Sequence, residues 1–517
     1  MEGSTLADRI GPRPGLSGRP LKPGTQQEFA RLRQLLGEVG FTPGAAQQLL
    51  GSTPLVALEK TLDRPFTEPA SAHETLFRLF VEGTSLDREI VERLVPPELL
   101  GLLERMRLLQ DSPVPNRLEA PLALYPTGGL FVVSDHAGVA LARQPPPDVV
   151  FPAVSTNTVD FLAGLPATPC DALLDLGSGT GVAAMLAAVR GARHAWAVDI
   201  TARSTRIAEF NFQLNGIGAV TPLEGDLYEP VRGMTFDRII THPPYMPASD
   251  NRVIFRDSGE DGEQLTRRIM AGLPEFLRPG GRCYWRGMAT DRVDAPLEQR
   301  VRDLLGPAND QFDVAVIAAL TMSAAPFWAR LLAKGDLTAA GFEERMRVFN
   351  GLGIENMVIG SIVVRRHTER RRPITVRRQL AHDGSIDPAF ADWLFRWEQL
   401  RHEDGFRERL LQLRPSISPH AEIQLLHRAT QGQLRAEQCT AITTWPFLES
   451  IDGPPSLVLL FGRADGTRTL AELRTELAGA GAILGREPLD EFLDLVTQLI
   501  SGCILELEEI PLPLRSG

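Results

Sequence analysis

Cysteine is scarce in this chain. Only four occur among 517 residues, and no two of them stand at the spacing of a C-x-x-C pair. Short paired spacings are typical of zinc sites, and dense cysteines are typical of disulfide-stabilised secreted domains. We therefore expect reduced thiols, no metal site and no disulfide framework at the four positions, which are Cys170, Cys283, Cys439 and Cys503.

Long apolar runs are lacking as well. No stretch approaches the roughly 20 residues that cross a bilayer, and the first twenty residues contain no apolar core of a secretory signal. The sequence therefore predicts a cytoplasmic protein with no membrane contact. Positive charge is not in excess either, because 54 Lys and Arg stand against 65 Asp and Glu, giving a formal charge of −11. This balance argues against nonspecific wrapping of nucleic acid.

One local exception is a crowd of arginines between residues 365 and 378. A basic patch for nucleic acid is one interpretation, and a solvated strand end and loop is the other, which we favour. The residues are Arg365, Arg366, Arg370, Arg371, Arg372, Arg377 and Arg378.

The length predicts several domains, since single cores stop growing at about 250–300 residues. Composition divides the chain into four parts. Residues 1–25 are rich in Gly and Pro and are expected to form a flexible tail. Residues 26–145 are predicted to form a helical, winged-helix-like domain, 146–375 an α/β domain, and 376–517 a mostly helical or winged-helix-like domain.

The N-terminal part shows helical and hairpin patterns. Phe29, Leu32, Leu35 and Leu36 form one apolar stripe at helical spacing, and two later apolar runs are joined by the turn residues 126–129. Short helices followed by a hairpin are typical of small modules that bind DNA, dimerise or dock a substrate. The mixed local charge favours docking, and a homodimer is possible.

From residue 171 onward, apolar strands alternate with helices. LLDLGSG and HAWAVDI read as buried strands, each followed by a helical pattern, and FDRIITHPPY reads as a strand entering a proline-rich loop. DVAVIAAL and NMVIGSIVVRR look like closing strands. This alternation predicts a doubly wound, largely parallel α/β sheet.

A glycine-rich turn follows the first of these strands. Glycines at 177, 179 and 181 allow the backbone to turn sharply and let a ligand lie against the main chain. The spacing G-x-G-x-G differs from the G-x-G-x-x-G of dinucleotide binders, whose pyrophosphate sits on the helix N-terminus. Asp175, just before the glycines, is placed to face an ammonium group. A tight turn without a ligand is the plain alternative.

Two more carboxylates follow the next strands. Asp199 ends the second strand and can accept hydrogen bonds from both hydroxyls of a ribose. Asp226 follows the third strand, where it could bind an adenine amino group with Leu227 beside the ring. Either aspartate alone could be a helix cap or a turn residue. Because parallel strands end at the same edge of a sheet, the three acidic positions together predict a nucleoside pocket.

The fourth strand leads into His242-Pro243-Pro244-Tyr245. The two prolines fix φ and remove two amide donors, which leaves carbonyls free to accept an N–H. Tyr245 offers a flat face to a planar group. We interpret the loop as a binding site for a planar substrate nitrogen; an ordinary proline-rich loop is the alternative.

Together, LLDLGSGTG, AVDI, NFQLNGI, GDLYEP and HPPY resemble the class I S-adenosylmethionine-dependent methyltransferases with an (Asn/Asp/Ser)-Pro-Pro-Tyr loop. Within these, the chain is most similar to the small-methyltransferase group, which contains protein-glutamine N5- and ribosomal-RNA guanine N2-methyltransferases. The resemblance covers residues 150–290 and extends less specifically to 370. FRDSGEDG, at 255–262, is similar to a bacterial branch of multidomain methyltransferases. The resemblance implies a seven-stranded class I sheet and S-adenosyl-L-methionine as cofactor.

The resemblance also implies roles for single residues. Those that would hold the cofactor are Asp175, Gly177, Ser178, Gly179, Gly181, Asp199, Ile200, Asp226, Leu227 and, in a covering segment with Thr156 and Asn157, Thr158. Those that would hold the methyl acceptor are His242, Pro243, Pro244 and Tyr245.

This chain departs from the family at the head of the loop, where His242 replaces Asn or Asp. Asn accepts an N–H and has no acid–base role, whereas imidazole can accept one hydrogen bond and can also take a proton near neutral pH. The favoured hypothesis is an N-methyltransferase acting on a protein, an RNA or an amine. A small-molecule or peptide O-/N-methyltransferase with His242 as base is the second, and a binding protein with a degenerate core is the third.

Overall fold

The computed structural model divides into two compact units, residues 1–287 and 288–517. It describes residues 21–50, 68–140, 145–248, 252–335, 337–382, 384–385, 387–430 and 432–513. The tail predicted for residues 1–25 lies almost entirely outside this range. The predicted domain bounds and the possible homodimer stay predictions.

The first unit begins with helix α2 (Gln26–Glu38), which starts at a capping box formed by Thr25 and Glu28. It buries the four apolar residues of the predicted stripe. These residues join a core that also contains Phe210 and Leu214 of the later helix α11. The helices that follow α2 are α3 (Pro43–Leu50), α5 (Ala72–Leu76), the π-helix η2 (Phe77–Val81), α6 (Arg88–Leu94) and α7 (Pro97–Arg105).

Five short strands follow or interrupt these helices. Strands β1 (Leu86–Asp87), β3 (Arg117–Glu119) and β2 (Gln110–Asp111) form a small antiparallel sheet in that order. Strands β4 (Ala123–Thr127) and β5 (Leu130–Ser134) form the predicted hairpin. Its turn is only two residues long, and both are glycines with φ of 56° and 79°. A tight turn of this length requires positive φ at both positions, which explains the Gly-Gly pair.

A sheet of eight strands has the order β13-β11-β12-β10-β9-β6-β7-β8. The pairs β10–β9, β9–β6, β6–β7 and β7–β8 are parallel. In the second unit, β11 is antiparallel to β12 and parallel to β13. The largely parallel α/β sheet is therefore confirmed, with one strand more than expected. The strands are β6 (Cys170–Leu176), β7 (Ala192–Asp199), β8 (Val220–Glu224), β9 (Phe236–Thr241), β10 (Leu277–Arg292), β11 (Phe312–Ser323), β12 (Ile354–Arg366) and β13 (Thr375–Gln379).

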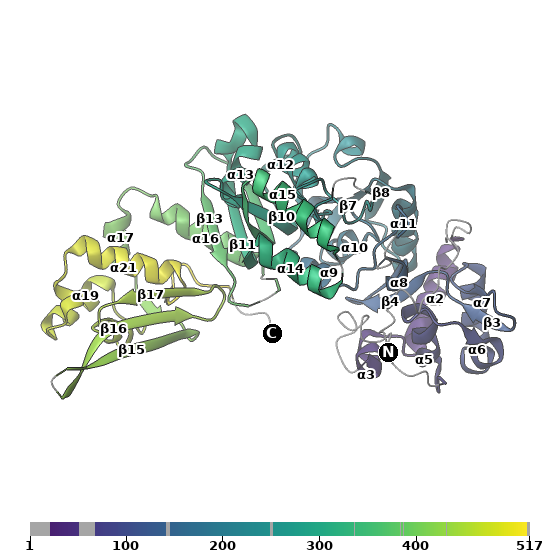
Figure 1. The fold of residues 1–517 in the computed structure, drawn as a ribbon, viewed down its shortest axis with the longest axis horizontal. Helices are drawn as coiled ribbons and strands as arrows, with labels where there is room; N and C mark the ends of the chain where they lie inside the picture. Colours follow the sequence, from purple (N-terminus) through teal and green to yellow (C-terminus); the bar gives the residue numbers. More distant parts are fainter. Residues whose placement is uncertain are drawn as a thin grey trace. The chain divides into compact units, whose positions relative to one another are not determined.

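Helices of the first unit connect and cover these strands. Helix α10 lies against β7, and α11 lies against β8 (Figure 1). Helix α11 ends at Gly216 with φ of 67°, as the Asn-Gly pair predicts. The helices here are α8 (Ala137–Ala140), α9 (Thr156–Ala163), α10 (Val182–Val189), α11 (Ala202–Asn215), the 3₁₀ turn η3 (Glu229–Val231) and α12 (Gln264–Phe276).

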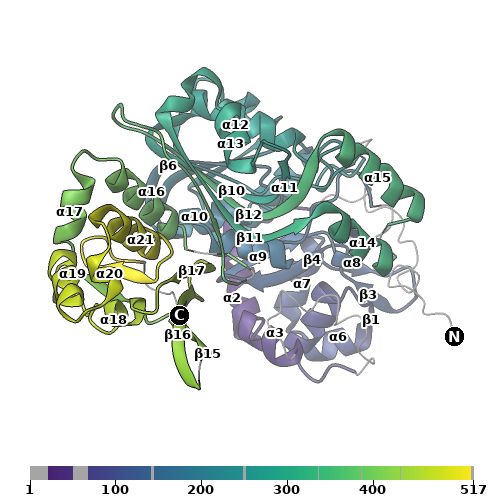
Figure 2. The same ribbon diagram turned by 60° about the vertical axis from the view of Figure 1, so that its left-hand side comes forward.

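The second unit contains helices, and it also contains a further sheet, which the sequence did not predict. Strands β15 (Ala421–Thr430), β16 (Gln433–Thr443) and β17 (Glu449–Gly453) form an antiparallel sheet, with β15 and β16 as a long hairpin (Figure 2). Most side chains near the tip of this hairpin are exposed, so no alternation of apolar and polar residues marks the strands. Strands β14 (Pro415–Ile417) and β18 (Leu505–Leu507) form a separate pair.

The predicted helix cap near Thr469 is confirmed by a capping box between Thr469 and Glu472. The helices of this unit are α13 (Leu297–Leu304), η4 (Gly306–Gln311), α14 (Ala324–Lys334), α15 (Ala339–Gly351), α16 (Ala389–Arg401), α17 (Phe406–Gln412), α18 (Leu457–Phe461), α19 (Leu470–Gly479), α20 (Ile483–Arg486) and α21 (Leu489–Ser501).

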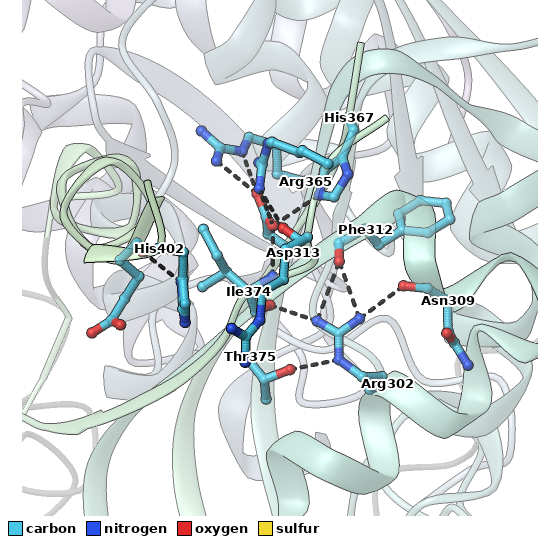
Figure 3. A network of polar contacts seen from close by, with 12 residues as sticks. Arg302, Asn309, Phe312, Asp313, Arg365, His367, Ile374, Thr375 and His402 are labelled. Atoms are coloured by element: carbon cyan, nitrogen blue, oxygen red, sulfur yellow. Dashed lines mark hydrogen bonds and ion pairs between the residues drawn. The ribbon is translucent and has the colours of Figure 1, made fainter. Parts of the chain in front are cut away.

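The crowded arginines serve internal ion pairs. Asp313 is completely buried and accepts a hydrogen bond from Arg365 at 2.6 Å (Figure 3). It also accepts one from Arg371 at 3.1 Å. Arg377 pairs with Asp291 at 2.7 Å. Since a buried carboxylate needs such partners, Arg365 ties β12 to β11, Arg371 ties the loop before β13 to β11, and Arg377 ties β13 to β10. For them, the favoured interpretation of a solvated strand end was wrong.

All four cysteines are free thiols, and three of them are buried. Burial raises the pKa of Cys283 to about 12. Within the residues that the structure describes, no helix has the length and apolar character needed to cross a bilayer.

Candidate active site

Four parallel strands end at one edge of the sheet. Leu176, the last residue of β6, is paired with Val198 of β7 and with Thr241, the last residue of β9. Asp199, the last residue of β7, is paired with Glu224, the last residue of β8. The turns and loops that follow these strands therefore lie along a common edge, where ligands of such sheets bind.

The glycine turn leaves open space at two of its three glycines. Gly177 and Gly179 have φ of 71° and 52°, and a Cβ added at either would meet no atom within 4 Å. Gly181 differs, because a Cβ there would lie 2.5 Å from the ring of Phe212. The first two glycines thus leave room for a ligand, whereas Gly181 allows α10 to pack closely against α11.

Asp199 is hydrogen-bonded to the glycine turn. One carboxylate oxygen accepts from the backbone N–H of Gly179 at 2.9 Å, and the other accepts from the N–H of Thr201 at 3.0 Å. The oxygen that accepts from the Thr201 N–H also accepts from the Thr201 hydroxyl at 3.2 Å. A diol can therefore bind at the free site of the other oxygen and in place of the Thr201 hydroxyl, so that the half-buried carboxylate holds the turn and the diol together. Ile200, the next residue, is 53% exposed.

The turn is supported from behind by α11. Asn211, completely buried, donates to the carbonyl of Thr180 at 2.9 Å and accepts from the N–H of Val133 in β5 at 2.8 Å. Ser178 Oγ, in contrast, is shielded from solvent and has no hydrogen-bond partner among the described residues. A buried hydroxyl without a partner is unusual, and a bound ligand would supply one.

Asp175 is 2% exposed and accepts a hydrogen bond from the N–H of Ala184 at 3.2 Å. Burial, with a smaller contribution from the negative charge of Asp199, raises the pKa of Asp175 to about 7. A cationic group placed nearby would favour the ionised carboxylate.

Asp226 lies beside the end of β7, because the N–H of Gly225 donates to the carbonyl of Asp199 at 2.9 Å. Its carboxylate pairs with Arg268 of α12 at 2.8 Å. Leu227, which follows, has a φ of 50°, a conformation that side-chain-bearing residues seldom adopt. The turn after β8 is thus close to Asp199. One carboxylate oxygen of Asp226 is already paired with Arg268.

The His242 ring lies close to two aromatic rings. Its centre is 5.4 Å from that of Phe161 and 5.8 Å from that of Tyr245, with which it is stacked. Burial and, to a smaller degree, the positive charge of Arg286 lower the pKa of His242 to about 4. The imidazole is therefore neutral at pH 7, and it has one acceptor nitrogen and one N–H. A group with this pKa is a weak general base at neutral pH.

Helix α9 contributes two residues that the sequence did not single out, Asp160 and Phe161, together with Asn157 of the predicted covering segment. Asp160 pairs with Arg286 at 2.8 Å, and Phe161 contacts His242. Asn157 donates to the hydroxyl of Tyr245 at 2.6 Å. No motif marked Asp160 and Arg286, which are 126 positions apart.

Thr158, predicted in a covering segment, lies in the first turn of α9. Its hydroxyl is 3.0 Å from that of Ser155, and its N–H donates to the same hydroxyl at 3.3 Å. The described contacts of Thr158 thus cap α9, whose Asn157 and Phe161 contact the His242 loop.

The segment FRDSGEDG supports the other side of the loop. Met246 forms a parallel bridge with Asp257, whose carboxylate caps the N–H of Val253 at 2.9 Å. A Cβ at Gly262 would lie 2.3 Å from the carbonyl oxygen of Tyr245, so only glycine permits this approach. The motif noted in the sequence therefore fixes the backbone just after the Pro-Pro-Tyr sequence.

The first four strands of the parallel sheet are followed by the features expected of class I methyltransferases. A glycine turn follows the first strand, an aspartate ends the second, and a proline-rich loop follows the fourth. The family model described as "Methyltransferase small domain" matches residues 154–304. The predicted resemblance to the small methyltransferases is thereby confirmed for this part of the chain.

The curated relatives that match this chain are named as methyltransferases. A Methanocaldococcus jannaschii protein named as an N5-glutamine methyltransferase is 35% identical over 115 residues, covering 21% of this chain and 57% of that protein. The release factor glutamine methyltransferase of Xylella fastidiosa is 36% identical over 118 residues, covering 21% of this chain and 43% of that enzyme. The chain thus spans about half the length of the curated relatives it matches.

Among solved structures, the chain is similar to ribosomal protein L11 methylase from Lactobacillus delbrueckii subsp. bulgaricus. The identity is 18%, the TM-score is 0.24, and the match covers 41% of this chain and 79% of that one.

Proposed function

We propose that this chain is an S-adenosylmethionine-dependent N-methyltransferase that acts on a protein acceptor. The observation that carries the proposal is the common edge, where the glycine turn, Asp199 and the His242 loop follow parallel strand ends in matching register. A cytoplasmic location, expected from the sequence, is part of the same proposal.

The residues at the edge fit the cofactor. Gly177 and Gly179 leave open space, Ser178 has a buried hydroxyl without a described partner, and Asp199 can accept from ribose hydroxyls. When bound, the cofactor supplies a methyl group on a sulfonium. The residues proposed to hold it are Asp175, Gly177, Ser178, Gly179, Gly181, Asp199, Ile200, Asp226, Leu227 and Thr158, with Gly181 acting through packing.

The acceptor proposed is the side-chain amide of a protein glutamine. The relatives named above, and one named ribosomal protein uL3 glutamine methyltransferase from Bradyrhizobium diazoefficiens, support this choice. An amide nitrogen is uncharged, and its lone pair is delocalised into the carbonyl, so acceptors of its N–H groups are needed to make it more nucleophilic. As the C–N bond forms and the C–S bond breaks, the nitrogen loses one proton, which passes to solvent. Neutral His242 can accept one of its N–H groups, and the loop carbonyls can accept the other.

The acceptor must be positioned closely, because the attacking nitrogen must lie about 3–3.5 Å from the methyl carbon and in line with its bond to sulfur. His242, Pro243, Pro244 and Tyr245 are proposed to provide that placement. A role of His242 as general base, which the small-molecule hypothesis needs, is less well supported, since its low pKa leaves little driving force for proton uptake.

The test is transfer from cofactor labelled in its methyl group to separated protein, RNA and small-molecule fractions of a bacterial extract. We expect label in protein, and we expect acid hydrolysis to release it as methylamine, because an N-methyl amide is cleaved there whereas methylated lysine or arginine is not. Label confined to RNA or small molecules, or no transfer to any fraction, would contradict the proposal.

Cofactor affinity should depend on pH through Asp175. The cofactor's ammonium group favours the ionised carboxylate, whose pKa is about 7 in the free protein. Affinity should therefore fall as pH drops below 7, by roughly tenfold per unit. Asp175→Asn should bind more weakly at pH 7 and lose this slope between pH 7 and 5.5 in calorimetric titrations. Asp171→Asn, at an exposed position of the same strand, should keep the parent slope.

A further inference from the structure

One face of helix α9 contacts the His242 loop and the strand next to it. Asp160 and Phe161 lie three and four positions after Asn157, so both flank it on one side of the helix. Their partners are Tyr245, Arg286 and His242, in that order. The contacts include a hydrogen bond, an ion pair and a ring contact, so they constrain the loop in different ways.

The ion pair is the most buried of these contacts. The side chains of Arg286 and Asp160 are 6% and 20% exposed. Arg286 follows Trp285, which is paired with Thr241 at the end of β9, so the guanidinium stands at the level where the loop begins. A buried guanidinium is costly without a carboxylate. Asp160 therefore fixes a cation beside His242.

The hydrogen bond from Asn157 sets the direction of the Tyr245 hydroxyl. Because the Asn157 nitrogen donates, the phenolic oxygen accepts, and its own proton points away from α9. Gly287 adds to this fit, since a Cβ there would lie 3.1 Å from the Tyr245 ring and 2.9 Å from that of Trp285. The ring is thus held at its edge by β10 and at its hydroxyl by α9.

We propose that helix α9 is a positioning element for the His242–Tyr245 loop, with the Asp160–Arg286 ion pair as its central contact. This inference rests on the proposed function, in which the loop holds the methyl acceptor. The helix holds the His242 and Tyr245 rings in place beside the acceptor. The positive charge of Arg286 helps to lower the pKa of His242, which agrees with a neutral imidazole.

The chain offers a control for the loss of the aspartate charge in a more exposed pair, whose side chains are 33% and 40% exposed. Asp237 and Arg278 form a contact of 3.0 Å near the other ends of the same two strands, β9 and β10. Asp237→Asn removes the same charge from an aspartate–arginine pair, far along the strands from the loop. If a change in hydrogen exchange or kcat came only from a general weakening of β9 and β10, it should appear in both Asp160→Asn and Asp237→Asn.

The experiment compares the full-length parent with Asp160→Asn, Asp160→Glu, Asn157→Ala and Asp237→Asn. Hydrogen exchange is measured for peptides covering residues 241–248, and S-adenosylmethionine affinity is measured by calorimetry. Methyl transfer is measured as kcat and KM with a glutamine-containing model peptide as the probe.

We expect Asp160→Asn and Asn157→Ala to speed exchange in residues 241–248 and to lower kcat by about tenfold, as a displacement below 1 Å would. Cofactor affinity should stay within about twofold, and Asp160→Glu should restore part of kcat. Asp237→Asn should match the parent in all three measurements.

The proposal is overturned if Asp160→Asn leaves exchange in residues 241–248 unchanged, or if Asp237→Asn changes exchange and kcat equally. A parent protein that transfers no methyl group would count against the proposed function instead. In that case the exchange measurements alone decide whether α9 positions the loop.

Discussion

Asp199→Ala should reduce affinity for S-adenosylmethionine by at least about 100-fold. The variant loses the carboxylate that would accept two ribose hydroxyls, and each hydrogen bond to a charged group is worth about 1.5–3 kcal/mol. It also loses the bond to the Gly179 N–H that holds the glycine turn. Calorimetric titration of the purified full chain measures the loss.

Glu224→Ala is the control, because Glu224 ends the neighbouring strand in register with Asp199 and its side chain is exposed. It should bind within about threefold of the parent. Equal affinity of the two variants would mean that the ribose is not held at the end of β7.

The second large effect is expected at His242. His242→Ala should lower the rate of methyl transfer by about 100-fold, since the loop loses the side chain that accepts the substrate N–H. His242→Asn should keep the rate within about fivefold of the parent, because an amide oxygen accepts the same hydrogen bond. Both variants should bind the cofactor normally, because His242 follows β9 and lies outside the glycine turn.

Single-turnover rates with a glutamine-containing peptide measure this difference. Between pH 6 and 8.5 the parent rate should show no titration of His242, whose pKa of about 4 lies below this range. If His242→Asn were as inactive as His242→Ala and the parent rate rose with a pKa near 6.5, His242 would act as a base.

Much of the candidate site could be predicted because local sequence carries it. A glycine turn needs glycines at fixed spacing, and an aspartate at a strand end stays at that end whatever surrounds it. Parallel pairing then brings Asp199 and Thr241 to the same edge. The Asn211 side chain that holds the glycine turn also lies in a motif quoted from the sequence, NFQLNGI.

The rest depends on contacts between distant residues. Asp160 and Arg286 look like ordinary surface charges until the fold buries them together. The same holds for Asp313. Because the fold buries this carboxylate, nearby arginines that were expected to be solvated form ion pairs with it. Strand β13 was missed because it has five residues and only Val376 is buried.

The central claim is most directly tested by a crystal structure of the full chain with S-adenosylhomocysteine. The account predicts density for the ribose at the Asp199 carboxylate, the main chain of Gly177 and Gly179 against the ligand, and the sulfur facing the His242–Tyr245 loop. Density at any other edge of the sheet, or a glycine turn closed by side chains with the ligand absent, would contradict it.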